Sequence, residues 1–140
     1  MPRDYPDRPI VGVGAVIVLD QRVVIVKRST EPLKGEWSIP GGALELGETL
    51  SHGAVREALE ETGLEVEPAG IIEVFDRIYP DADGRIRYHY VLVDFLCRPI
   101  SGELRAGGDA AQARWVSREE LPQFKLTETA TRIILKALEG

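Results

Sequence analysis

A glycine-led loop that runs into a glutamate-rich helix constrains this chain more than any other feature. Residues 42–64 read GALELGETLSHGAVREALEETGL, which places Glu57, Glu60 and Glu61 at positions i, i+3 and i+4 of the predicted helix. This spacing puts three carboxylates on one stripe of an α-helix. Each like-charge pair there costs roughly 0.2–0.5 kcal/mol. The stripe therefore predicts a use for concentrated negative charge, and binding a divalent cation is the simplest one.

The helix is predicted to span about residues 50–62. Thr49 or Ser51 can cap its start, and Gly63 suits the left-handed conformation just past its end. Gly53 leaves a flat spot on the carboxylate face, where a ligand or a loop can approach. The opposite arc is predicted to be buried, and it consists of Ala54, Val55, Ala58, Leu59 and Thr62.

The loop before the helix adds groups that suit a hard cation or a phosphate. Pro40, Gly41 and Gly42 do not favour a regular strand, and paired glycines let backbone atoms come close to a ligand. Glu45 and Glu48 bring two more carboxylates to the start of the helix. A site of carboxylates and carbonyls with no Cys or His cluster nearby predicts Mg²⁺, and Mn²⁺ would also fit.

The fixed positions of this segment resemble the box that defines the Nudix hydrolases. Gly42, Glu48 and the run REALEETGL at residues 56–64 match every fixed position of that box, which spans residues 42–64. Two segments outside the box also resemble the family: WSIPG at residues 37–41 and RWVSREELP at residues 114–122. Nearly the whole chain is therefore covered by the resemblance.

The resemblance implies one Nudix domain over residues 1–140, with an α/β fold in the form of an α/β/α sandwich around a mixed β-sheet. It implies an enzyme that hydrolyses the pyrophosphate bond of a nucleoside diphosphate linked to another moiety, X, with divalent metal and an attacking water. Carried over by position, the implied metal ligands are Glu57, Glu60 and Glu61, with the Gly41 carbonyl as a fourth.

The resemblance also implies catalytic roles. Glu57 is the first candidate for the general base, and Glu48 and Asp109 are the alternatives. Asp109 lies outside the box, where some relatives have the carboxylate that acts as base. Arg56 in the family orients a neighbouring glutamate, and here Glu60 or Glu48 is within its reach. The residues themselves do not decide which carboxylate accepts the proton.

The identity of X depends on residues outside the box. Pro80 lies sixteen positions after Leu64, where the family associates a proline with ADP-ribose hydrolysis, and the stretch RYHYVLVDFLCRPISGELRAGGDA resembles small prokaryotic ADP-ribose pyrophosphatases. The expected products are AMP and ribose 5-phosphate. The aromatic candidates for stacking on adenine are Phe75, Tyr79, Tyr88 and Tyr90, and the candidates for phosphate contacts are Arg28, Arg77 and Arg87.

Three other functions remain open from the sequence. A pyrophosphohydrolase that removes damaged nucleoside triphosphates, or a hydrolase of dinucleoside polyphosphates, would share the box and differ in the pocket. A non-catalytic nucleotide sensor is the alternative from a different class. The intact carboxylates and the lack of an additional DNA-binding segment oppose it.

Composition narrows the expected partners. A net charge of −6 without a Lys/Arg cluster argues against binding to nucleic acid. No apolar run approaches the ~20 residues of a membrane span, and the N-terminal MPRDYPDRP lacks the apolar core of a signal peptide. We therefore expect no membrane association, a cytoplasmic location and a small-molecule nucleotide partner, with a homodimer possible. Cys97 is the single cysteine and is expected to be buried.

Strands and a last helix complete the predicted fold. The strands come in two hairpins, 10–18 with 23–28 and 68–78 with 85–97. Ser117 and Glu120 form a capping-box pattern that opens a short helix. Thr127 begins a last helix, and its apolar stripe consists of Ala130, Ile133, Ile134, Ala137 and Leu138.

Overall fold

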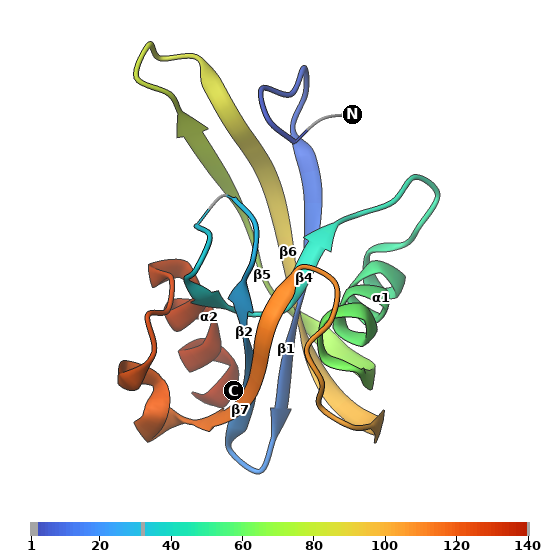
Figure 1. Ribbon diagram of the computed structural model, residues 1–140. Coiled ribbons are helices and arrows are strands. Elements are labelled where there is room, and N and C mark those ends of the chain that lie inside the picture. Colours follow the sequence, from blue (N-terminus) through green and yellow to red (C-terminus); the bar gives the residue numbers. More distant parts are fainter. Residues whose placement is uncertain (1–2, 32, 140) are drawn as a thin grey trace.

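A mixed β-sheet lies between two α-helices in the computed structural model, which describes residues 3–31 and 33–139. Helix α1 (Leu50–Thr62) covers one face of the sheet and α2 (Glu128–Glu139) covers the other (Figure 1). The predicted α/β fold with helices on both sides of the sheet is confirmed. Met1 and Pro2, the first two residues of the N-terminal segment, lie outside the described residues.

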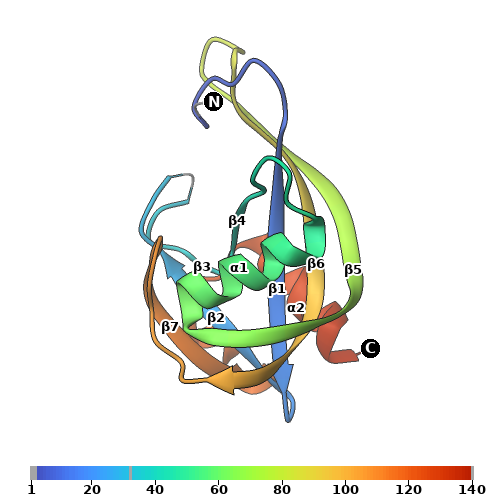
Figure 2. The ribbon, with the colours of Figure 1, turned by 90° about the vertical axis from the view of Figure 1, so that its right-hand side faces the viewer.

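The sheet is mixed because one central pair of strands is parallel. Its strands are β1 (Ile10–Leu19), β2 (Arg22–Arg28), β3 (Trp37–Ser38), β4 (Gly41–Ala43), β5 (Leu64–Pro80), β6 (Ile86–Gly102) and β7 (Ala110–Ser117). Their order is β3-β2-β1-β6-β5, with β4 paired to β1 and β7 paired to β2. Strands β1 and β6 run parallel, and the other pairs are antiparallel. In Figure 2, β5 curves along one side of α1.

Both predicted hairpins are confirmed, and their strands extend beyond the predicted limits. Asp20 and Gln21 join β1 to β2 with φ values of 51° and 63°, as a two-residue hairpin turn requires. In the β5–β6 turn, the Asp81 carboxylate accepts hydrogen bonds from the amides of Asp83 and Arg85 at 2.9 Å each. These two hydrogen bonds stabilise the turn that joins the long strands.

The prediction that Gly41 and Gly42 do not favour a regular strand is wrong, because both belong to β4. Gly41 and Gly42 pair with Gly14 and Val13 of β1. A Cβ atom on Gly41 would lie 2.6 Å from the Val13 carbonyl oxygen. Glycine is therefore what allows β4 to approach β1 so closely.

Helix α1 has the predicted limits, and three residues of its predicted buried face, Ala54, Ala58 and Thr62, are buried. Thr49 caps its start, since the Thr49 hydroxyl accepts a hydrogen bond from the His52 amide at 3.2 Å. Leu59 is 51% exposed, whereas Glu57 and Glu61 are buried. The reason is a stripe at i, i+3, i+4 and i+7 that packs on the sheet and consists of Ala54, Glu57, Ala58 and Glu61.

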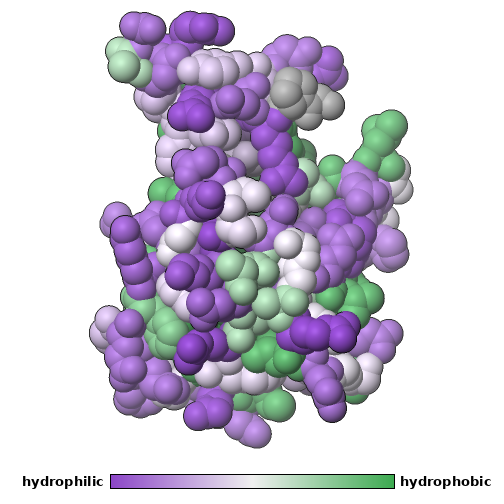
Figure 3. All heavy atoms as spheres, viewed as in Figure 1, coloured by the Kyte–Doolittle hydropathy of each residue, from purple (hydrophilic) through white to green (hydrophobic). Residues whose placement is uncertain are grey.

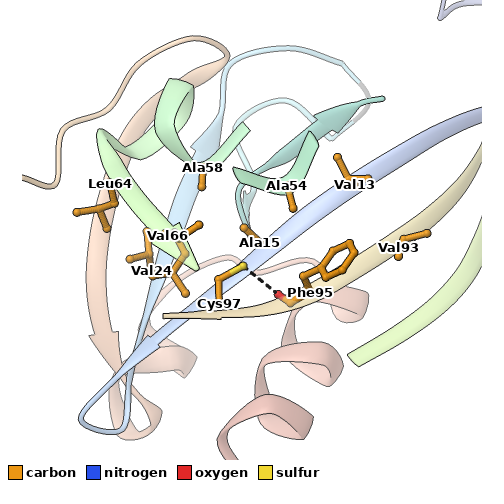
Figure 4. Packing of buried hydrophobic residues seen from close by; sticks show 11 residues of the cluster. Val13, Ala15, Val24, Ala54, Ala58, Leu64, Val66, Val93, Phe95 and Cys97 are labelled. Atoms are coloured by element: carbon orange, nitrogen blue, oxygen red, sulfur yellow. Dashed lines mark hydrogen bonds between the residues drawn. The ribbon is translucent and has the colours of Figure 1, made fainter. Parts of the chain in front are cut away.

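Small side chains bring α1 close to the sheet. Figure 4 shows Ala54 and Ala58 of the helix in one cluster with Val13 and Ala15 of β1. Gly53 is buried too. A Cβ there would lie 2.9 Å from Leu44 and 3.0 Å from Val13, so the loop before the helix and strand β1 both pack against this glycine. Cys97 is buried in the same cluster, as predicted.

The opposite face of the sheet is covered by α2. Its five predicted apolar residues are all buried, and four of them, Ile133, Ile134, Ala137 and Leu138, pack with side chains of β1, β2 and β7. The capping box of Ser117 and Glu120 is present and opens a 3₁₀-helix, η1 (Arg118–Gln123). The two clusters on either side of the sheet fix both helices relative to the strands.

The outer surface is mostly polar on the face drawn in Figure 3, where hydrophobic groups are scattered among hydrophilic ones. Among the described residues, neither α1 nor α2 combines the length and the apolar character needed to cross a membrane.

Gly63 provides a test of how the end of α1 is fixed. Its φ of 74° is left-handed, and a Cβ there would lie 2.6 Å from the Glu103 carbonyl oxygen. Gly47 has a similar φ of 84° but open space around it. Chemical denaturation should show that Gly47→Ala costs about 1–2 kcal/mol from backbone strain alone, and that Gly63→Ala costs more. Equal losses would mean that close packing at Gly63 adds nothing.

Candidate active site

Two adjoining cavities lie around the glycine-led strand and the glutamate helix. We call the first the acidic cavity, and it is lined by Arg3, Ala43, Leu44, Glu45, Arg56, Glu57, Glu60, Glu61, Gly108 and Asp109. We call the second the sheet cavity, because it lies over β1, β5 and β6 and reaches the start of α2. Both cavities share four lining residues: Arg3, Ala43, Glu61 and Asp109.

Arg56 organises the acidic cavity. Its Nε and Nη2 donate to the Glu48 carboxylate at 2.6 and 2.9 Å, and Nη1 donates to Glu57 at 2.8 Å. Nη1 also donates to Glu60 at 3.3 Å, and Nη2 donates to the Ala43 carbonyl at 3.0 Å. These hydrogen bonds lower the pKa of Glu48 to about 2. The arginine therefore holds Glu48 as a carboxylate and aligns the side chains around it.

Glu61 lies one turn after Glu57 on the same helix stripe, and fewer hydrogen bonds compensate for the burial of its carboxyl group. Its Oε1 accepts a hydrogen bond from the Gly41 amide at 3.1 Å. Burial, with further contributions from Glu57 and Asp109, raises the pKa of Glu61 to about 8. Burial also raises the pKa of Glu57, although Arg56 opposes that rise. Two buried carboxyl groups thus lie where a cation would stabilise their charged forms.

The first glycine of the box makes room for one of these carboxylates. A Cβ on Gly42 would lie 2.6 Å from the Glu57 carboxyl carbon. Any side chain at this position would displace Glu57. The glycine is therefore needed to bring the carboxylate against β4.

The donor chemistry fits a hard divalent cation. Glu57 and Glu61 both line the acidic cavity, and the Glu60 side chain is 51% exposed. As these side chains stand, no group of three or more His, Cys, Asp or Glu within residues 3–31 and 33–139 is arranged to hold a metal ion. In this arrangement Arg56 Nη1 donates to both Glu57 and Glu60, at 2.8 and 3.3 Å.

Asp109, selected from the sequence, borders both cavities. Its carbonyl accepts hydrogen bonds from the Ser29 amide at 3.0 Å and the Ser29 hydroxyl at 2.6 Å, which anchors the loop to the end of β2. Arg3 lies 4.0 Å from the Asp109 carboxylate. Sequence reasoning missed Arg3, because nothing in an irregular N-terminal segment signals that it reaches this site.

Five of the seven predicted substrate residues come together in the sheet cavity: Arg28, Phe75, Arg77, Tyr79 and Tyr90. Arg87 and Tyr88 are not among the described residues that line it. Arg87 instead pairs with Asp4 at 3.0 Å. Tyr88 is buried, with its ring stacked on Tyr90 at 6.4 Å between centroids. Pro80 is exposed at the end of β5.

Other residues of the sheet cavity were missed from the sequence. Thr127 and Thr129 line the cavity from the start of α2, and Thr129 accepts a short hydrogen bond from Arg77. Asp94 lines the cavity from β6 and is buried. Its signal was present in the run YVLVDFLC, where one acid interrupts an apolar strand.

Comparisons with known proteins agree with this geometry. Residues 8–137 match the NUDIX domain family. The ADP-ribose pyrophosphatase of Methanocaldococcus jannaschii is 37% identical over 83% of this chain and 66% of that protein. The human 8-oxo-dGDP phosphatase NUDT18 is 33% identical over 77% of this chain and 32% of that protein. The crystal structure of a MutT NUDIX hydrolase from Burkholderia pseudomallei is 32% identical, with a TM-score of 0.80 over 93% of this chain and 98% of that one.

The fold, the complete box and these matches place the chain in the NUDIX family, and the domain is that of a Nudix pyrophosphohydrolase. Nudix hydrolases generally need divalent metal ions. The chain spans just under two thirds of the length of the archaeal relative and about a third of the human one.

Glu61 gives the metal-free protein a predictable pH dependence. Its folded pKa of about 8 lies above its ordinary value of 4.5, so its contribution to stability is complete below pH 4.5 and is lost as the pH rises through 8. Urea denaturation without metal should show the free energy of unfolding falling over this range, by at most about 1.4 kcal/mol per pH unit for one proton.

The matched control is Glu61→Gln, which keeps an acceptor for the Gly41 amide and does not titrate. Its stability should lack this part of the slope. Glu48 acts in the opposite window, because its pKa of about 2 lies below the ordinary 4.5, and its contribution is lost as the pH falls between those values. An unchanged slope between pH 4.5 and 8 in Glu61→Gln would show that Glu61 does not titrate as described.

Proposed function

We propose that this protein hydrolyses the pyrophosphate bond of ADP-ribose to give AMP and ribose 5-phosphate. One observation carries the proposal: the acidic cavity adjoins an aromatic-lined cavity, and Glu61 and Asp109 border both. A substrate with a pyrophosphate in the middle and a base at one end would occupy both cavities at once. The ADP-ribose pyrophosphatase of M. jannaschii, at 37% identity, supports this choice of substrate.

Glu57, Glu60 and Glu61 would hold Mg²⁺ or Mn²⁺, and the Gly41 carbonyl is the proposed fourth ligand. Magnesium is the first choice because carboxylate and carbonyl oxygens form a hard-donor set. A bound divalent ion offsets the charge of the pyrophosphate and lowers the pKa of a bound water.

The chain itself supplies orientation and a proton acceptor. Arg56 fixes Glu57 through a hydrogen bond of 2.8 Å, so that one carboxylate oxygen is held in place. Glu48 accepts two hydrogen bonds from Arg56, and its pKa of about 2 makes it a weak base, so we assign it the role of positioning Arg56. The general base is then Glu57 or Asp109.

The sheet cavity would bind the nucleoside end. Phe75, Tyr79 and Tyr90 offer rings for stacking on adenine, at about 1–3 kcal/mol per base. Arg28 and Arg77 would contact phosphate or ribose oxygens. Arg87 and Tyr88, which lie away from the cavity lining, are proposed only to support the hairpin that carries these rings.

A second candidate is hydrolysis of a damaged nucleotide, and the likeness to the human 8-oxo-dGDP phosphatase NUDT18 favours it. The acidic cavity would serve either substrate, and the difference would lie in the sheet cavity. The proposed partners are a small-molecule nucleotide and, in a homodimer, a second copy of the chain. The cytoplasm remains the expected location.

The substrate is tested by measuring kcat/KM with Mg²⁺ or Mn²⁺ for ADP-ribose, 8-oxo-dGDP, nucleoside triphosphates and diadenosine polyphosphates. ADP-ribose should give the highest value, and chelation of the metal should abolish turnover. Glu61→Gln should lose most of the activity because an amide keeps the shape of the ligand but not its charge. A triphosphate or 8-oxo-dGDP as the better substrate would replace the first candidate with the second.

Asp109→Asn separates the two candidates for the base. If Asp109 acts mainly in the transition state, the variant should lower kcat far more than it raises KM. Asp76→Asn is a suitable control because Asp76 is exposed on β5 and is not among the described residues of either cavity. An unchanged kcat in Asp109→Asn would assign the base to Glu57.

A further inference from the structure

The acidic cavity contains two arginines, and one of them is fully engaged by the protein itself. Among the described residues that line this cavity, five carry carboxylates and the two arginines are Arg3 and Arg56. A guanidinium group has five N–H donors. Arg56 donates five hydrogen bonds, to three glutamates and one backbone carbonyl. Arg56 therefore has no donor left for a ligand.

Arg3 keeps its donors available. Its Nη1 lies 4.0 Å from Asp109 Oδ2, which is beyond hydrogen-bonding distance, and both side chains are about half exposed. Ion pairs this exposed contribute little to stability. Across residues 3–31 and 33–139, no hydrogen bond from the Arg3 side chain is found. The guanidinium can therefore turn to a ligand without losing a hydrogen bond to the described part of the chain.

Arg3 lies where the two cavities meet. Of the four described residues that line both cavities, it is the one cation. Burial raises the pKa of Glu57 in the acidic cavity, and Arg56 and then Arg3 oppose the rise. Burial also raises the pKa of Tyr90 in the sheet cavity, and Arg3 and Arg28 oppose it. The charge of Arg3 thus acts on both sides of the junction.

The segment that carries Arg3 is anchored to the β5–β6 hairpin, beside which Figure 2 draws it. The Tyr5 amide donates to the Arg87 carbonyl at 2.7 Å, and the Tyr5 hydroxyl donates to the Asp81 carboxylate at 2.8 Å. The Arg85 guanidinium lies 4.6 Å from the centre of the Tyr5 ring. Tyr5 is therefore fixed by its backbone, its hydroxyl and its ring.

The backbone turns sharply at Tyr5. Its φ of 51° is left-handed, which is uncommon for a residue other than glycine. Asp4 accepts a hydrogen bond from Arg87 Nε at 3.0 Å. The two residues that follow Arg3 are thus both held by the hairpin, and Arg87 helps to hold the segment that brings Arg3 to the cavities.

We propose that Arg3 binds the substrate phosphate next to the nucleoside, and that Tyr5 is a positioning residue that acts through Arg3. A substrate with its nucleoside in the sheet cavity and its pyrophosphate in the acidic cavity places that phosphate at the junction. A planar guanidinium donates two parallel hydrogen bonds to phosphate oxygens. The inference rests on the proposed function in one respect, that a nucleotide occupies both cavities.

The first test is the affinity for AMP and adenosine, measured by isothermal titration, since neither has a pyrophosphate bond to hydrolyse. Arg3→Ala should weaken AMP binding by about 10- to 100-fold, as the loss of a hydrogen bond to a charged group predicts. Adenosine binding should not change, because adenosine has no phosphate. Arg3→Lys should lie between Arg3→Ala and the wild type, because an ammonium keeps the charge but not the paired donors.

Arg8→Ala is the matched control because it removes the same charge from the same segment. Arg8 lies 3.4 Å from Asp7 and is not among the described residues that line either cavity. Its affinity for AMP should match that of the wild type. Equal losses in Arg8→Ala and Arg3→Ala would assign the effect to the overall charge of the segment and contradict a contact.

The second test is steady-state kinetics with ADP-ribose. Arg3→Ala should raise KM by about 10- to 100-fold and leave kcat unchanged, the pattern of a contact made equally in the ground state and the transition state. Tyr5→Ala should also raise KM, but it should add nothing further in the Arg3→Ala background. Additive effects in the double variant would show that Tyr5 does not act through Arg3.

Three results would overturn the phosphate contact. The first is an unchanged affinity for AMP in Arg3→Ala. The second is equal weakening of AMP and adenosine, which would indicate a packing role. The third is a lower kcat with an unchanged KM, which would place the effect of Arg3 in the chemical step.

Failure of this inference can be told apart from failure of the proposed function. Arg3-dependent binding of AMP without hydrolysis of ADP-ribose would refute the proposed reaction and support the phosphate contact. Hydrolysis of ADP-ribose with the same KM and the same AMP affinity in Arg3→Ala and the wild type would do the reverse.

Discussion

The burial of two glutamates on the sheet-facing stripe of α1 is the constraint on which the rest of the site depends. Glu57 and Glu61 share that stripe with Ala54 and Ala58, so the helix cannot pack on the sheet without burying acid. Burying an unpaired carboxylate is costly, which is why Arg56 and the Gly41 amide lie against them. The same packing that stabilises the fold therefore concentrates charge that a divalent cation would neutralise.

This close packing requires glycine at several positions around the site. Gly42 leaves space for the Glu57 carboxylate, Gly41 lets β4 approach β1, and Gly53 lets a loop approach the helix. In β1, Gly14 gives Asp94 its space. The acidic cavity and the sheet cavity meet at the residues that line both, which include Glu61 and Asp109.

Local patterns in the sequence predicted much of the fold. The limits of α1, its caps, both hairpins and the buried stripe of α2 followed from spacing and turn chemistry, which act within a few residues. The buried face of α1 followed only in part, because hydrophobicity alone assigned Leu59 to the core and the glutamates to the surface. Only the position of β4 against the helix reverses that assignment.

Sequence patterns likewise predicted one part of the candidate site and missed another. Glu57, Glu60, Glu61 and Arg56 lie within one helix, so their proximity could be predicted from periodicity. Arg3 and Asp94 reach the cavities through long-range pairing of strands and loops, which single-sequence patterns do not encode. Arg87 and Tyr88 have suitable side chains, but the hairpin directs them to other contacts.

Binding of Mn²⁺ tests the central claim most directly, namely that buried Glu61 links the packing of α1 to metal binding. Electron paramagnetic resonance of free Mn²⁺ during titration reports affinity without any substrate. Wild-type protein should take up the ion, and Glu61→Gln should bind it at least about 10-fold more weakly, while Asp76→Asn should match the wild type. Equal Mn²⁺ affinity in Glu61→Gln and the wild type would contradict the account.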